Sequence, residues 1–344
     1  MEFLDEESKN ELNNRIMNSA RKYRKNRIRS KAILYSSVAS FIVFGFSLWF
    51  YSIEKQENNA VIKNTANDHS GVNTSSEIKL ILSNNEEVEV KSENASIVYS
   101  NNGQTLKINN SYKNLQLSDN EGAVGYNTVL VPYGRTAQLT MVDRSKVWLN
   151  AGTKFTYPTR FINNRREVFL EGEAIFEVSH QKESPFYVVG NHNHIIKVLG
   201  TTFNVSSYPD DNYINTALVN GSVEISYGEN PKTQKIIPGT LAVYKKEQNT
   251  IVTEQADLKP HMSWRDGLLM FKKNDLKYIM KRISRHYNTP IHMEAYQNNN
   301  LTYSGTLDIK KDLVEVMDVL KEIANFDYKI TNNKIEILTK KNSQ

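Results

Sequence analysis

The chain has 344 residues, enough for two or three domains, and its 39% hydrophobic and 24% charged residues are typical of a folded protein rather than a disordered one. It has no cysteine, which excludes disulfides and thiolate metal sites. Residues 1–31 hold nine Lys or Arg and five Asp or Glu, whereas the remainder holds 34 and 33. Because the large remainder is nearly neutral, it lacks the charge pattern of a nucleic-acid-binding surface, and we expect no nucleic-acid partner.

Residues 1–31 are predicted to form a short cytoplasmic segment with one helix. Ser8-Lys9-Asn10-Glu11 matches a capping box, and Leu12 and Ile16 follow at helical spacing. So few apolar residues cannot bury a core. The segment is therefore either a solvated stem or a docking helix that needs a partner.

Residues 32–53 form an uncharged, mostly apolar run of 22 residues, and we predict a transmembrane helix there. A helix rises about 1.5 Å per residue, so roughly 20 residues cross a bilayer core of about 30 Å. The 11 residues before the run contain seven Lys or Arg, and the 17 residues after it contain two. Positive charge stays on the cytoplasmic side, which predicts a single-pass protein whose N-terminus lies inside and whose residues 54–344 lie outside.

Two alternatives for this apolar run are weaker. A cleaved signal peptide would have an apolar stretch of about 7–15 residues and a small-residue cleavage site, neither of which is present. A buried core helix would normally carry polar positions on one face. The polar residues 54–76, rich in Asn, Ser and Thr, are predicted to be a linker.

Residues 77–255 show the short alternating pattern of β-strands. Ile78, Leu80 and Leu82 alternate with polar residues, and Asn84-Asn85 is a turn signal. Similar runs recur up to Val243, separated by Gly and Pro. The pattern predicts a mainly antiparallel all-β domain, built as a sandwich, a roll or a solenoid.

Residues 264–338 show a different spacing of apolar residues, with helical as well as strand-like segments. Helical spacing begins after Asn274-Asp275, either of which can be the N-cap, and again after the N-cap candidate Asp312, and strand-like runs lie around both helices. Asn332-Asn333 is a favourable hairpin turn. The order β-α-β-β-α-β-β predicts a small C-terminal α+β domain in which the aromatic residues pack in the core: Phe271, Tyr278, Tyr287 and Tyr303.

Motifs that carry catalysis or bind a cofactor are missing: there is no Walker loop, no G-x-G-x-x-G, no G-x-S-x-G and no H-E-x-x-H. His192 and His194 have a spacing compatible with a metal, but they lack a third ligand, so an exposed pair is expected. Glu171, Glu173 and Glu177 would share one side of a regular strand, and we interpret them as a solvated face neutralised by Arg165-Arg166. We therefore predict no enzyme activity, no catalytic residues, no cofactor and no metal site.

The central segment resembles the FecR family of membrane-anchored sigma-factor regulators. The resemblance rests on several motifs in a fixed order, namely Asn127–Gly134 (NTVLVPYG), Leu139–Gly152 (LTMVDRSKVWLNAG), Leu170–Ala174 (LEGEA), Phe176–Val178 (FEV), Val198–Val205 (VLGTTFNV) and Pro238-Gly239. In this pattern Gly134, Gly172, Gly200 and Gly239 suit turns or positive φ, and Trp148 and Phe176 are expected in the core. The segment from Trp264-Arg265-Asp266-Gly267 onward resembles the domain that follows in Bacteroidota-type members, which is similar to the short N-terminal module of secretins and TonB-dependent receptors.

The resemblance implies a signalling role. Such proteins receive a signal in the periplasm from the signalling domain of an outer-membrane TonB-dependent receptor and pass it to a cytoplasmic extracytoplasmic-function sigma factor. In many members membrane proteases release the cytoplasmic piece. Typical members carry a longer sigma-binding segment than residues 1–31, so the alternative is an anchored periplasmic binding or scaffold module without sigma-factor output.

Overall fold

The computed structural model describes residues 76–100, 103–114, 124–162, 164–228, 232–293, 296 and 301–339, all within one compact unit, Ser70–Gln344. The predicted cytoplasmic segment, the transmembrane helix at 32–53 and the linker up to residue 75 lie outside these residues. Within the part that is described, none of the helices has the length and apolar character needed to span a bilayer.

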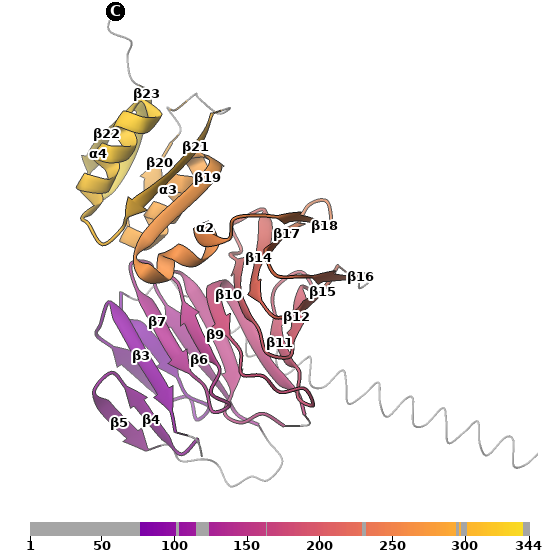
Figure 1. Ribbon diagram of the computed structural model, residues 1–344. Helices are drawn as coiled ribbons and strands as arrows, with labels where there is room; N and C mark the ends of the chain where they lie inside the picture. Colours follow the sequence, from indigo (N-terminus) through magenta and orange to yellow (C-terminus); the bar gives the residue numbers. More distant parts are fainter. Residues whose placement is uncertain are drawn as a thin grey trace, which may run out of the picture. The chain divides into compact units, whose positions relative to one another are not determined.

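The β domain comprises strands β1 to β18 (Figure 1). Their bounds are β1 Ile78–Ile81, β2 Glu87–Val90, β3 Asn94–Tyr99, β4 Thr105–Ile108, β5 Ser111–Asn114, β6 Tyr126–Val131, β7 Thr136–Thr140, β8 Lys146–Leu149, β9 Thr153–Pro158, β10 Arg166–Glu177, β11 Phe186–Val189, β12 Ile195–Val198, β13 Thr202–Ser207, β14 Tyr213–Asn220, β15 Val223–Tyr227, β16 Lys232–Ile236, β17 Thr240–Lys245 and β18 Thr250–Gln255.

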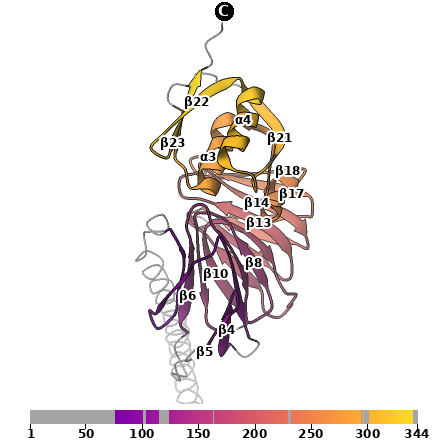
Figure 2. The ribbon, with the colours of Figure 1, turned by 90° about the vertical axis from the view of Figure 1, so that its left-hand side faces the viewer.

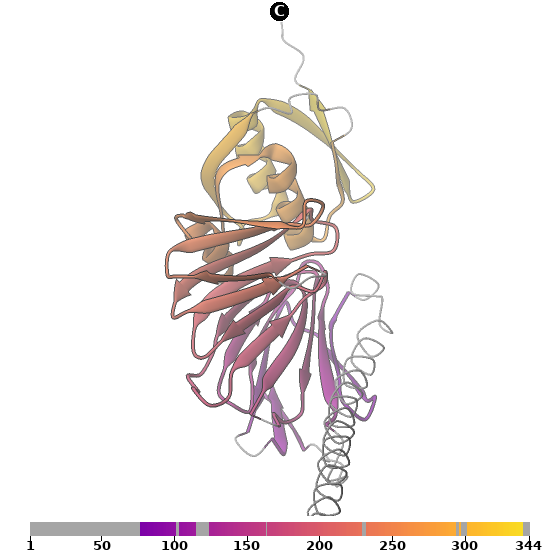
Figure 3. The same cartoon turned by 90° about the vertical axis from the view of Figure 1, so that its right-hand side faces the viewer.

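These strands form two layers that share β10. One layer has the order β2-β1-β6-β9-β10-β11-β12-β15-β16. The other has the order β5-β4-β3-β7-β8-β10-β13-β14-β17-β18. Apart from the parallel pairs β3–β7 and β10–β11, all of these pairs are antiparallel, which confirms the predicted mainly antiparallel β architecture. Figure 3 shows the strands lying side by side in layers.

The two layers enclose one hydrophobic core. Phe155 on β9 and Phe176 on β10 come from different layers, and their ring centroids lie 6.0 Å apart. Phe176 also stacks on Phe203 of β13 at 5.0 Å. Alternating apolar residues on each strand therefore point inward from both layers, as expected for a sandwich-like packing of two sheets.

Gly172 is the point where β10 passes from one layer to the other. Residues before it pair with β9 and β11, and residues from 172 onward pair with β8 and β13. Gly172 has φ 111°, and a Cβ there would lie 2.7 Å from the Cα of Thr153. Only glycine combines this backbone angle with so close an approach of two chains.

The C-terminal domain follows the connecting helices α2 (Lys259–Met262) and η1 (Ser263–Asp266). It runs in the predicted order β-α-β-β-α-β-β, namely β19 Leu268–Asp275, α3 Leu276–Tyr287, β20 Ile291–His292, β21 Thr302–Asp308, α4 Leu313–Ala324, β22 Phe326–Thr331 and β23 Lys334–Thr339. Asp275 caps α3 and Asp312 caps α4, as predicted. Asn332 and Asn333 both have positive φ in the β22–β23 turn.

Two small sheets flank the helices of the C-terminal domain (Figure 2). β19 pairs with β21, and β20-β23-β22 form the second sheet. A second hydrophobic core, separate from that of the β domain, includes Ile283 of α3, Leu320 of α4 and Phe326 of β22. Phe271 is buried in this core, and Tyr278, Tyr287 and Tyr303 pack against it, as predicted.

Candidate functional site: a charged junction between the two domains

Helix α3 carries three cationic side chains that face the β domain: Lys281, Arg282 and Arg285. Arg285 is four residues after Lys281 and three after Arg282, so it neighbours both of them on the helix surface. The apolar residues Ile279, Met280 and Ile283 bury the other side of the same helix in the C-terminal core. The amphipathic pattern therefore directs the cations away from that core.

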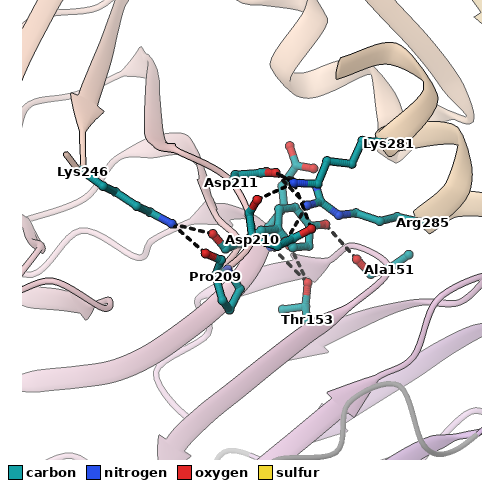
Figure 4. A network of polar contacts seen from close by, with 10 residues as sticks. Ala151, Thr153, Pro209, Asp210, Asp211, Lys246, Lys281 and Arg285 are labelled. Atoms are coloured by element: carbon teal, nitrogen blue, oxygen red, sulfur yellow. Dashed lines mark hydrogen bonds and ion pairs between the residues drawn. The ribbon is translucent and has the colours of Figure 1, made fainter. Parts of the chain in front are cut away.

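Arg285 binds the acidic turn that joins β13 to β14 (Figure 4). Its Nη2 donates to Oδ1 of Asp210 and to Oδ1 of Asp211, each at 2.8 Å, and its Nη1 donates to Oδ2 of Asp211 at 3.0 Å. Lys281 adds ion pairs of 2.9 Å to Asp210 and 2.6 Å to Asp211. The fork-like contact fixes the direction of approach as well as the charge pairing.

The ring of Tyr208 packs against the guanidinium group of Arg285. The guanidinium carbon of Arg285 lies 3.7 Å from the centroid of the Tyr208 ring, a cation–π contact. The Tyr208 hydroxyl donates to the carbonyl oxygen of Ala151 at 2.8 Å, and Lys246 Nζ donates to the Tyr208 carbonyl at 2.7 Å. These contacts anchor the turn to the rest of the β domain, independently of the contacts that α3 makes with it.

The pKa directions agree with this geometry. Burial alone would lower the pKa of Arg285, but its hydrogen bonds to Asp211 and the nearby carboxylates outweigh burial and raise that pKa. Burial would raise the pKa of Asp211, but Arg285 and Lys281 hold it below its ordinary value. Both groups are therefore charged over the whole neutral range.

Glu173 on β10 is the second anionic anchor of the junction. Its Oε2 accepts from Asn150 Nδ2 at 2.8 Å, and its Oε1 accepts from Asn204 Nδ2 at 3.2 Å. The Arg282 guanidinium reaches Oε2 at 3.9 Å. Glu173 is only 4% exposed, so these partners replace the water that it gives up on burial.

A third pair joins the connector η1 to the end of β10. Arg265 donates to Glu177 at 3.2 Å and lies over the ring of Trp148 at 5.0 Å from the centroid. Arg265 and Trp148 border a groove of about 990 Å³ whose walls also include Gln138 and Lys310. The β domain thus contacts the segment from η1 to α3 at three places. They are Glu173 and Glu177 on β10 and the β13–β14 turn.

Several predictions from the sequence are corrected here. Glu171, Glu173 and Glu177 do not form one solvated face, because β10 changes layers at Gly172 and Glu173 is buried. Arg165 and Arg166 do not neutralise this cluster: Arg165 pairs with Glu167, and Arg166 pairs with Asp143 at 2.8 Å.

Trp148 and His194 also differ from expectation. Trp148 does not enter the core of the β domain but lines the groove under Arg265. His194 is 2% exposed, and burial lowers its pKa to about 4, so it is not part of an exposed pair with His192. Among the described residues no group of His, Asp and Glu has the arrangement of a metal site.

The sequence did not identify the acidic turn or the basic side of α3. Asp210-Asp211 follows Pro209 in an ordinary turn signal, and Lys281, Arg282 and Arg285 are ordinary helix residues. The amphipathic pattern of α3 held one signal, because the cation at residue 285 lies close to the apolar stripe of the helix. In the fold this residue is only 5% exposed. Only the fold, however, brings the two segments together.

Two family models match the chain. The model described as "FecR protein" matches residues 127–224, and the model described as "FecR, C-terminal" matches residues 268–337. Asp211 and Glu173 lie in the first region, and Arg282 and Arg285 lie in the second. The junction therefore connects the two regions that the models match.

The chain is also similar to two crystal structures of a protein from Parabacteroides distasonis ATCC 8503 that is described as a candidate anti-sigma factor. In both cases the sequences are 27% identical, the TM-score is 0.58, and the match covers 62% of this chain. It covers 98% of one crystallised chain and 99% of the other. No curated protein matches this chain.

Proposed function

This chain belongs to the FecR family, and from that premise we propose that it regulates an extracytoplasmic-function sigma factor from a position in the inner membrane. The observation that carries the proposal is the match to both FecR models, together with the likeness to structures described as candidate anti-sigma factors. The apolar run at 32–53, behind its basic cluster, supports a single-pass anchor with a cytoplasmic N-terminus.

We propose that residues 1–31 contact the sigma factor. The helix predicted from Ser8 to about Arg24 is short, and it would fold on docking to its partner, as amphipathic helices do in grooves. Membrane proteases that act on the anchor would release this piece.

We propose that the input comes from the periplasmic signalling domain of a TonB-dependent outer-membrane receptor. The C-terminal domain offers strand edges for such a partner, since β22 pairs only with β23, and β21 only with β19, among the described strands. An open edge presents unpaired backbone N–H and C=O groups, which an added strand can satisfy.

The charged junction supports transmission between the two domains. A partner that moves α3 must alter the contacts of Arg285 with Asp210 and Asp211, because these side chains hold α3 on the β13–β14 turn. A change at the C-terminal domain would thereby reach the β domain, which precedes it in the chain and follows the predicted anchor.

The proposed contact between residues 1–31 and the sigma factor is tested with the full chain and with a variant in which residues 1–31 are replaced by an unrelated basic segment. The variant keeps the positive charge that orients the anchor. We expect the natural chain, but not the variant, to retain the sigma factor in a pull-down and to alter transcription from its promoters. If neither chain retains the sigma factor or alters transcription, the result would instead support the periplasmic scaffold module.

The proposed binding of the receptor's signalling domain to the edge of β22 is tested with Ile330→Lys on β22 and Val314→Lys on α4. The two side chains are 48% and 47% exposed, so both changes place a charge at a similar surface position. We expect only Ile330→Lys to weaken binding of the receptor's signalling domain. Equal loss for both variants, or loss for neither, would argue against the β22 edge.

A further inference from the structure

Strand β18 is an open edge of the β domain (Figure 1). Each of its residues is paired with β17, and β18 pairs with no other described strand. Its residues are exposed except for Ile251, which is half-buried. An open edge presents a row of unpaired backbone N–H and C=O groups, which another strand can satisfy.

The other edges of the described β layers have features that discourage such pairing. β2 and β5 are only four residues long, and β2 carries two glutamates. β16 carries two lysines. Short strands and charged side chains, lysine above all, protect natural sheets from unwanted partners. β18 is six residues long and has neither lysine nor proline, with Glu254 as its one charged residue. Of these edges, β18 is therefore the one best suited to accept another strand.

The outer face of β18 indicates which strand fits it. Val252 of β18 lies directly opposite Val243 of β17, and opposite residues of paired strands share one face. Val243 is half-buried and Val252 is 48% exposed, so this apolar pair is open to solvent at the edge. A second β18 that runs antiparallel about Val252 brings its own Val252 to this position. The apolar row then continues through Val252 and Val243 of the second copy.

The charges on the same face are complementary in this register. Lys245 lies opposite Thr250, and Glu254 lies opposite Leu241. Within the described part of one chain, neither Lys245 nor Glu254 forms an ion pair. Pairing about Val252 places Thr250 opposite Glu254 of the second copy, so Lys245 lies two strands, or about 10 Å, from that residue. Both side chains are long enough to meet across this distance, and the two-fold symmetry provides the contact twice.

We infer that β18 is a self-association edge, through which two copies of this chain pair as antiparallel strands about Val252. The interface is isologous, because the two-fold axis passes through Val252 and each copy offers the same surface. One pair of strands is a small interface, so association is weak in dilute solution and is favoured where anchors hold the chains in one membrane. The inference goes beyond the proposed function, since neither residues 1–31 nor the edges of the C-terminal domain take part.

A single engineered thiol tests the pairing directly, because the natural chain has no cysteine. Facing residues of antiparallel strands have Cα atoms about 4.5–5.5 Å apart, a separation that a disulfide spans. We expect mild oxidation of the full-length Val252→Cys chain in detergent to give mainly a disulfide-linked dimer. Ile330→Cys is the matched control, because Ile330 is also 48% exposed and lies on the edge strand β22. A dimer yield for Val252→Cys no higher than for Ile330→Cys would overturn the inference.

Charge reversal tests the register without a cysteine. Sedimentation velocity of the full-length chain over a range of concentrations measures the fraction of dimer. Glu254→Lys places a lysine beside Lys245 of the second copy and should shift the chain toward monomer. The double variant Lys245→Glu/Glu254→Lys restores opposite charges and should recover the dimer fraction of the natural chain. A double variant as monomeric as Glu254→Lys, or a Glu254→Lys chain that dimerises like the natural one, would contradict the inference.

The signalling domain of a receptor is the alternative occupant of this edge. Amide hydrogen exchange of the natural chain distinguishes the two, because a paired edge strand exchanges more slowly than an open one. We expect the amides of β18 to become more protected as the concentration of the chain rises, with no receptor present. A chain that is monomeric at every concentration overturns the inference, and protection of β18 only after the signalling domain is added then assigns the edge to the receptor.

Discussion

Arg285 and Asp211, 74 residues apart in the sequence, are joined by two hydrogen bonds of 2.8 and 3.0 Å. Arg285 comes from the last turn of helix α3, and Asp211 comes from the turn between β13 and β14. The pair links the last structural domain to the one before it. It is also the contact on which the proposed transmission depends.

Asp211→Asn should destabilise the junction. The change removes the charge that faces Arg285 and Lys281, and a hydrogen bond to a charged group contributes about 1.5–3 kcal/mol. We expect the free energy of unfolding to fall by about 2 kcal/mol, measured by urea titration of the full chain. Glu315→Gln is the control, because Lys311 and Glu315 are both more than half exposed and solvent screens such pairs, so they contribute little to stability. Equal losses for the two variants would contradict a special role for Asp211.

Glu173→Gln should be far more harmful than Glu171→Gln. Glu173 is buried and faces Arg282, whereas Glu171 is partly exposed beside Asn191. Removing one partner of a buried charge pair typically costs about 3–5 kcal/mol, and we expect a loss near the lower end because Arg282 keeps other contacts. Unfolding by urea measures both variants. Similar small effects would mean that Glu173 is solvated in solution.

Gly172→Ala should disrupt β10. The new Cβ would meet the Thr153 side chain and backbone, and the φ of 111° is unfavourable for alanine. Strain and overpacking together should cost about 3 kcal/mol or more. Gly190→Ala is the matched control, because Gly190 ends the adjacent strand region and its Cβ would have a nearest neighbour at 3.5 Å. The prediction fails if thermal unfolding shows the same midpoint for both variants.

Acidification should weaken the fold through buried histidine. Burial lowers the pKa of His194 to about 4 from 6.5. Between these values the unfolded chain binds a proton that the folded chain does not, so stability is complete above pH 6.5 and falls as the pH drops toward 4. Since one pKa unit corresponds to about 1.4 kcal/mol, the loss reaches about 3 kcal/mol.

Urea titrations at pH 7.5 and pH 5 measure this effect. His194→Gln should reduce the difference between the two pH values, because glutamine does not titrate. His192→Asn should leave it unchanged, since His192 is exposed and asparagine tolerates its positive φ. An unchanged difference in His194→Gln would show that other groups cause the acid sensitivity.

Much of the architecture follows from local sequence patterns. The alternation around Ile78 to Leu82 predicts a strand, and the caps Asp275 and Asp312 predict where α3 and α4 begin. These signals are local, because backbone geometry repeats every two residues in a strand and every 3.6 residues in a helix. They correctly gave a β-rich region followed by a small α+β domain.

The same patterns misplaced side chains at the site. Trp148 alternates like a core residue, and Glu171, Glu173 and Glu177 alternate like a solvated face. Alternation indicates which side of a strand a residue occupies, but it does not indicate what covers that side. Here Gly172 changes the layer of β10, and the segment from η1 to α3 covers the side that carries Glu173 and Glu177.

The sequence by itself determined the types of elements, their order and the resemblance to the FecR family. Only the tertiary structure decided which charges meet. Lys281 and Arg285 are paired with Asp210 and Asp211 because two hydrophobic cores fix the positions of α3 and of the β13–β14 turn. Local propensity acts over a few residues, whereas a contact across 74 residues depends on the packing of everything between them.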